Sequence, residues 1–166
     1  MQLSKGQLFW HYSVILLLLV SPAYTTVQAF KNFITHTYSG RPFKELLLPG
    51  YIWIIPAIGF FYVQKNRLRF KELYYSVDNK TFKSAVRQTA DDMEWTIEKE
   101  GDTYVVARSS FSWRSWGELI TIIKEKDKII FNSICDPDNR PSVASWGMNR
   151  INRKIFESHL IQLRTT

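Results

Sequence analysis

The chain has little cysteine, little histidine and none of the common catalytic motifs. Cys135 is the only cysteine among 166 residues, so an intramolecular disulfide and a cluster of metal-binding thiolates are both excluded. The three histidines, His11, His36 and His159, lie in three separate regions. The chain has no His-Glu-x-x-His, Gly-x-Ser-x-Gly, Gly-x-Gly-x-x-Gly or Walker-type phosphate loop. We therefore expect no catalytic, cofactor or metal site.

Charge is missing from two apolar stretches, residues 8–30 and 46–63. At about 1.5 Å per residue, the first stretch is long enough to cross a hydrocarbon core of about 30 Å. The second stretch is shorter and contains Pro49, Gly50, Pro56 and Gly59. We predict that residues 1–64 form a two-helix transmembrane hairpin, with spans at about 8–30 and 46–63.

The positive charge of the chain is concentrated directly after the second stretch. The net charge is +7, and residues 65–71 hold Lys65, Arg67, Arg69 and Lys71 without an acidic residue. Residues 72–166 hold 14 basic and 14 acidic residues, so this part is neutral. This distribution favours contact of the four basic residues with anionic lipid headgroups over nucleic-acid binding. By the positive-inside rule, both termini are expected on the cytoplasmic side.

A second interpretation makes the first apolar stretch a cleaved signal peptide. Lys5 would then be its basic region, Trp10–Val20 its apolar region and Val27-Gln28-Ala29 its cleavage site. The stretch is longer than an ordinary signal-peptide core, which favours a span. Under either interpretation, the second stretch returns the chain to the cytoplasm.

The part after the hairpin predicts a basic juxtamembrane linker at 65–79 and a cytoplasmic α+β domain at 80–166. Asp78-Asn79 is a helix N-cap pattern, and Phe82, Ala85, Val86, Thr89 and Met93 follow at helical spacing over about 80–93. A second helix is expected over about 145–163, with a stripe that consists of Met148, Ile151, Ile155, Leu160 and Leu163.

Four strands are expected between these two helices. Trp95–Glu98 alternates, and the run from Tyr104 to Arg114 places Val105, Ala107, Ser109, Phe111 and Trp113 on one face. Two more strands are expected at about 117–124 and 128–135, joined by a short polar turn. The order helix–four antiparallel strands–helix predicts a two-layer domain with both helices on one face of the sheet.

Three short motifs carry a resemblance to a known pattern. They are Ser115-Trp116-Gly117-Glu118, Asn132-Ser133 and the Gly-x-Asn-x-x-Asn run Gly147–Asn152. Residues 80–163 with these motifs resemble an uncharacterised family of small cytoplasmic α+β domains in bacterial membrane proteins. The resemblance implies the fold and a bacterial inner-membrane setting, and it implies no activity. The hairpin-and-domain layout is also similar to pleckstrin-homology-like membrane proteins, but those place their helix only after the sheet.

Three residues are candidates for contact with a protein partner: Trp116, Asn149 and Asn152. Trp116 is expected on the face opposite Trp113, and an exposed tryptophan often marks a contact surface. Asn149 and Asn152 are three residues apart, so both amides face one side of the helix. They either tie down the turn at Asp136–Pro141 or form a recognition notch with Ser142, Ser145 and Arg150; the general cost of unsatisfied buried backbone favours the tie-down.

These observations favour a membrane-tethered cytoplasmic interaction or regulatory module without catalytic activity. The expected partners are the lipid bilayer, its anionic headgroups and an unidentified protein. An alternative is an accessory subunit of a membrane complex that acts through its two spans. A pleckstrin-homology-like lipid-binding domain and an enzyme with a site assembled from distant residues are weaker alternatives.

Overall fold

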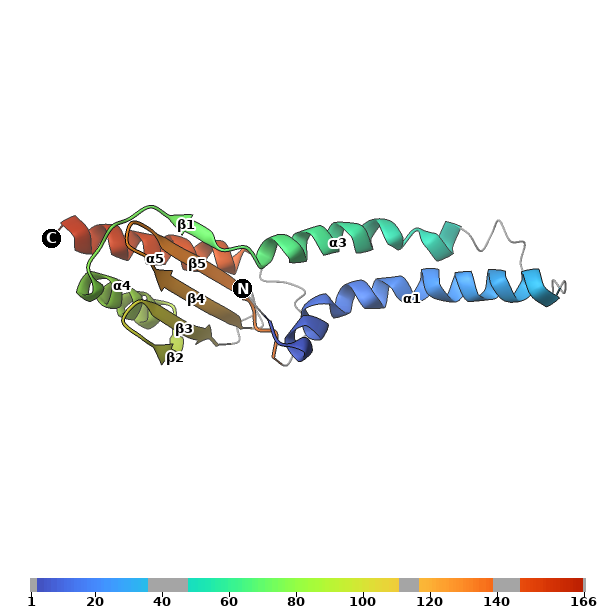
Figure 1. The fold of residues 1–166 in the computed structure, drawn as a ribbon, viewed down its shortest axis with the longest axis horizontal. Helices are drawn as coiled ribbons and strands as arrows, with labels where there is room; N and C mark the ends of the chain where they lie inside the picture. The colour runs from blue at the N-terminus through green and yellow to red at the C-terminus, as the bar shows by residue number, and fades with distance from the viewer. Residues whose placement is uncertain (1–2, 36–47, 111–116, 139–146, 166) are drawn as a thin grey trace. The chain divides into compact units, whose positions relative to one another are not determined.

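The computed structural model describes residues 3–35, 48–110, 117–138 and 147–165 (Figure 1). The chain divides into two compact units. One consists of residues 1–11 and 66–166, and the other consists of residues 12–65.

The unit of residues 12–65 is an antiparallel pair of helices, α1 (Lys5–Thr35) and α3 (Ile54–Arg67) (Figure 1). Near the start of α1, the ring of Tyr12 stacks on Phe61 with 5.9 Å between centroids. Further along α1, the Thr26 hydroxyl lies 3.0 Å from that of Tyr51. Gly50 packs so closely that a Cβ there would lie 2.2 Å from Thr25 Oγ1, so only glycine allows this approach.

The second apolar run is interrupted at residues 52–53, between a helical turn at 48–51 and α3. Pro56 explains the break, because proline has no N–H for the Ile52 carbonyl and its ring crowds that carbonyl. The Ile52 oxygen accepts instead from the Ile55 N–H at 3.3 Å. In the described ranges, α1 alone is long and apolar enough to cross a membrane. The prediction of two spans is therefore not confirmed, and α3 has only 14 residues.

The other unit is a mixed helix and sheet fold with one antiparallel sheet, as predicted. The sheet has five strands rather than the predicted four, in the order β1-β5-β4-β3-β2. In chain order, the elements of this fold are β1 (Lys71–Leu73), α4 (Asn79–Asp92), β2 (Trp95–Glu100), β3 (Tyr104–Ser109), β4 (Glu118–Lys124), β5 (Ile129–Cys135) and α5 (Met148–Thr165).

The additional strand, β1, lies inside the predicted linker at 65–79. It pairs with β5 through Lys71↔Phe131 and Leu73↔Ile129, and Leu73 is buried. A strand of three residues is too short to show alternation, so only its pairing with β5 reveals it. Strand β3 ends at Ser109, and the predicted continuation through Phe111 and Trp113 lies outside the described residues.

Helix α4 begins where the sequence predicted. The Asp78 carboxylate accepts a hydrogen bond of 2.7 Å from the Thr81 N–H, which satisfies one of the first unpaired donors of the helix. Side-chain and backbone hydrogen bonds from Thr81 lower the pKa of Asp78. All of the predicted apolar positions on α4 are buried except Met93, which is partly buried and packs against the core.

The core lies between one face of the sheet and the two helices. Val105, Ala107, Ile120, Ile122 and Phe131 supply the sheet side, and all are at most 1% exposed. Phe156 of α5 stacks on Phe131 at 5.7 Å and meets Phe82 edge-on at 6.4 Å.

The centre of the buried face of α5 differs from the predicted stripe. Its buried residues are Asn152, Phe156 and Leu160, whereas Met148, Ile151, Ile155 and Leu163 are half-buried. A hydrophobic stripe counts only apolar residues, so it could not include the buried amide of Asn152.

Candidate functional site

The four basic residues of the predicted membrane-surface segment extend from the end of α3, through the connection at Arg69, to the start of β1. The Lys65 Nζ lies 5.9 Å from the centroid of the Phe61 ring, within cation–π range. Arg67 is half-buried, and Lys65, Arg69 and Lys71 are exposed. Within the described part of the chain, none of the four forms a salt bridge with a carboxylate.

Asn132 fixes the backbone of this basic segment to the sheet. Its Nδ2 donates to the carbonyl oxygens of Arg67 and Arg69, both at 3.0 Å. Asn132 lies on β5 and is 3% exposed. Because Asn132 binds the main-chain carbonyl groups of the segment, these hydrogen bonds do not use its basic side chains.

A buried polar network joins β4, β5 and α5. Asn152 Nδ2 donates to Ser133 Oγ at 3.1 Å, and the Ser133 hydroxyl donates to Glu118 Oε2 at 2.7 Å. Glu118 and Asn152 are 0% exposed and Ser133 is 6% exposed. A hydroxyl can donate one hydrogen bond and accept others, so the direction of the chain Asn152→Ser133→Glu118 is fixed. The network brings together one residue from each of the three short motifs of the sequence.

Gly117 explains the geometry at the start of β4. Its φ is +94°, a left-handed conformation that favours glycine, and a Cβ there would lie 3.1 Å from the Ser109 carbonyl oxygen. The next residue, Glu118, donates its N–H to Ser109 Oγ at 3.0 Å. The Gly-Glu pair thus turns the chain into β4 with the carboxylate directed toward the core.

The structure separates Asn149 from Asn152. Asn149 is half-buried, and its Oδ1 accepts from the N–H of the next residue, Arg150, at 2.8 Å. Asn152 binds Ser133, and its buried Oδ1 has no hydrogen-bond partner among the described residues. Residues 139–141 of the turn lie outside the described residues, so the tie-down stays a prediction. Trp116, Ser142 and Ser145 lie outside the described residues, so the notch and the tryptophan surface stay predictions.

Sequence reasoning missed an ion cluster centred on Arg108. The guanidinium pairs with Glu98, at 2.6 Å from Nε, and also with Asp136 and Asp138. Gln7 Nε2 donates to Asp138 Oδ1 at 2.6 Å, which ties the start of α1 to the same cluster. A register shift between Ile97 and Lys99 marks a β-bulge at Glu98, on the edge strand. The only sequence signal was that Arg108 alternates away from the apolar face.

The cluster perturbs its titrating groups. Its three carboxylates raise the pKa of Arg108, although burial opposes this. The hydrogen bond from Gln7 and the nearby Arg108 charge lower the pKa of Asp138, again against the effect of burial. Arg108 and Asp138 are therefore both charged at neutral pH, and the cluster fastens the turn after β5 to β3.

The described residues show no arrangement for metal binding. In the parts of the chain that the structure covers, no three His, Cys, Asp or Glu side chains form a group that could hold a metal ion. His159 Nε2 lies 2.8 Å from Asp92 Oδ2, which links α5 to α4. We therefore interpret His159 as a residue that helps α5 to pack against α4.

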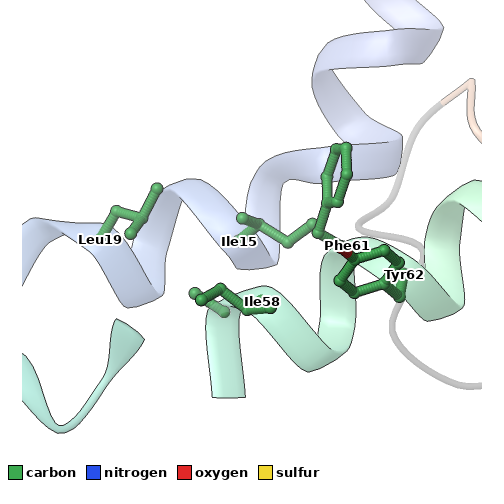
Figure 2. A pocket seen from close by; sticks show the side chains of 6 residues that line it. Ile15, Leu19, Ile58, Phe61 and Tyr62 are labelled. Carbon is green, nitrogen blue, oxygen red and sulfur yellow. The ribbon is translucent and has the colours of Figure 1, made fainter. Parts of the chain in front are cut away.

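An apolar groove of about 380 Å³ lies between α1 and α3. Figure 2 shows the side chains of Ile15 and Leu19 on α1 and of Ile58, Phe61 and Tyr62 on α3, which line the groove. Ala57 also lines the groove and is 3% exposed. The side chains that line the groove are apolar except for the Tyr62 hydroxyl.

Comparisons of the chain with family models, with curated proteins and with solved structures found no match. Function is therefore inferred from the residues themselves. In the described residues, the basic segment at 65–71 has three exposed cationic side chains, and the groove of α1 and α3 has exposed apolar ones at Leu19, Ile58, Phe61 and Tyr62.

Proposed function

We propose that the chain is a membrane-tethered interaction or regulatory module without catalytic activity. Helix α1 anchors it in a bilayer, which we take to be a bacterial inner membrane, the setting that the resemblance implies. The neutral α+β domain lies in the cytoplasm and binds a protein partner. The observation that carries the proposal is the exposed apolar surface of α1.

Large apolar side chains are exposed along the whole of α1. Leu17 is 71% exposed, Val27 63% and Phe33 76%, and no charged residue occurs between Leu8 and Phe30. A monomeric soluble protein rarely exposes a continuous apolar surface of this extent. A bilayer would cover it, and a helix of 31 residues exceeds the thickness of the hydrocarbon core.

We further propose that the segment from Leu48 to Arg67 returns the chain through the bilayer beside α1. Its helical parts, residues 48–51 and the 14 residues of α3, lie within a segment that is as long as a usual span, which has about 20 residues. The interruption at residues 52–53 leaves only a few backbone groups unpaired, and transmembrane helices tolerate such breaks when a neighbouring helix packs beside them. The basic segment that follows favours the cytoplasmic side.

Cysteine labelling in intact cells tests this arrangement. The variant Thr166→Cys, in a Cys135→Ser background, should resist a membrane-impermeant maleimide in intact cells and react after lysis. A matched variant, Ser39→Cys in the same background, places the thiol in the predicted external loop and should react without lysis. Labelling of residue 166 in intact cells would overturn the cytoplasmic assignment. Extraction of the protein from membranes by alkaline carbonate would overturn the membrane anchor itself.

The accessory-subunit alternative is favoured by one observation, the apolar groove between α1 and α3. A chimera separates it from the leading proposal. Residues 12–65 are replaced by an unrelated two-span hairpin, and partner capture in detergent is compared with that of the full chain. Partners that the chimera retains support the domain as the binding module. Partners that it loses support a function of the spans.

A further inference from the structure

The groove between α1 and α3 is lined by exposed apolar side chains and by one small residue that is nearly buried. Ile58 is 53% exposed, Tyr62 61% and Leu19 38%, whereas Ala57 is nearly buried. The short side chain of Ala57 leaves room that the longer neighbours enclose. The lining is aliphatic and aromatic, so its complement is a hydrocarbon chain.

A positive charge marks one end of the groove. Lys65 Nζ lies over the ring of Phe61, which lines the groove, and the chain continues with Arg67, Arg69 and Lys71. From Ala57 to Lys65, a helix rises about 12 Å, at 1.5 Å per residue. This distance is close to the thickness of one leaflet, which is about 15 Å.

We propose that this groove binds one acyl chain of an anionic phospholipid whose phosphate pairs with Lys65. The inference rests on the proposed membrane insertion of the helix pair. Another apolar helix would also fill the groove, but it would make no use of a cation at its end. A phosphate does, because a lysine at the cytoplasmic interface attracts anionic headgroups.

Photocrosslinking in lipid nanodiscs tests the proposal with the full-length protein. The nanodiscs contain phosphatidylcholine and a small fraction of phosphatidylglycerol that carries a diazirine in its acyl chain. Adducts mapped by mass spectrometry are expected mainly at the six lining residues. The same diazirine chain on phosphatidylcholine should give about fivefold fewer adducts, the factor expected for one lysine–headgroup contact.

Two matched pairs of variants separate the groove from general lipid contact. Ile58→Trp fills the groove from an exposed position and should remove most groove adducts. Ile55→Trp adds the same bulk at a 74% exposed position outside the lining and should leave them unchanged. Lys65→Gln should abolish the preference for phosphatidylglycerol, whereas Lys31→Gln, on an exposed residue of α1, should preserve it.

Three results would overturn the proposal. They are adducts spread evenly over the exposed faces of α1 and α3, equal yields from the two lipids, and crosslinks to a second protein in place of lipid. These failures differ from failure of the proposed function. A protein that inserts into membranes with its C-terminus inside, yet shows no preferred lipid, refutes only the groove. Extraction of the protein by alkaline carbonate would refute both the lipid site in the groove and the proposed membrane anchor.

Discussion

Individual polar side chains fasten the α+β domain at two places. Asn152, Ser133 and Glu118 form a buried network between α5 and the sheet, and Arg108 binds three carboxylates outside the core. The two differ in energetic character. A buried donor or acceptor that loses its partner keeps the full cost of its desolvation, whereas a half-exposed ion pair is screened by water.

Asn152 and Asn149 should therefore differ in their effect on stability. Asn152→Ala removes the amide that binds the buried Ser133 hydroxyl, and it should lower the free energy of unfolding by about 1–3 kcal/mol. Asn149→Ala removes a local contact with the Arg150 N–H and should change it by less than about 0.5 kcal/mol. Denaturant unfolding of the full chain in detergent measures both. Equal losses in the two variants would contradict this assignment.

Asp138 should make stability depend on pH in the acid range. Hydrogen bonding from Gln7 and the charge of Arg108 lower its pKa in the folded state below the ordinary value of 3.8. The stabilisation is therefore complete above pH 3.8 and is lost as the pH falls through the lower, folded-state pKa.

Unfolding midpoints of the wild type and of Asp138→Asn, measured from pH 7 down to strong acid, test this. The wild type should be the more stable at neutral pH, and the difference should shrink below pH 3.8. A difference that stays constant over this range would show that the Asp138 charge does not contribute.

At the scale of elements, proline and pairing decide where helices and strands end. Pro56 lies in the first turn of α3, where the missing N–H of proline destabilises a helix least. Residues 52–53, directly before α3, are not helical. Strand β1 has only three residues and depends on β5 for its hydrogen bonds. The apolar composition of the second run is the same whether or not the helix is continuous, so composition alone could not distinguish the two.

Replacing Pro56 should make the second helix continuous. In the wild type, the Ile52 carbonyl accepts a long hydrogen bond from the Ile55 N–H. In Pro56→Ala, the new N–H of residue 56 can donate to the same carbonyl. Amide exchange at residues 52–55 should be slower than in the wild type, in detergent or nanodiscs. Pro49→Ala, at the start of the preceding turn, is the control and should leave these amides unchanged. Equally fast exchange in both variants would assign the break to another cause.

At the scale of the whole molecule, charge is distributed unevenly between the parts of the chain. The four basic residues at 65–71 follow the second apolar run, while residues 72–166 are neutral. Such a distribution sets orientation in a membrane because basic residues near a span resist translocation.

Neutralising this segment should disturb the orientation of the chain. With Lys65, Arg67, Arg69 and Lys71 all changed to Gln, a smaller fraction of molecules should keep residue 166 protected from the impermeant maleimide. A control with the same loss of charge within the domain changes Lys80, Lys99, Lys126 and Arg153 to Gln and should keep full protection. Unchanged protection in the first variant would assign orientation to the apolar runs or to the loop.

The sequence by itself determined the features that depend on local periodicity. The N-cap at Asp78, the buried face of α4, the antiparallel hairpins of β2 to β5 and the apolar character of α1 all follow from neighbouring residues. Such patterns are readable because each helix or strand presents its side chains at a fixed spacing.

Only the tertiary structure decided which distant residues meet. Glu118, Ser133 and Asn152 come from three elements, and Arg108 reaches carboxylates on β2 and after β5. The pairing of β1 with β5 joins residues more than fifty positions apart. These contacts have no local periodicity, because burial and hydrogen bonding between elements select them after the chain folds. For this reason, the motifs that hold Asn152, Ser133 and Glu118 could be singled out from the sequence, whereas the meeting of these residues in one network could not.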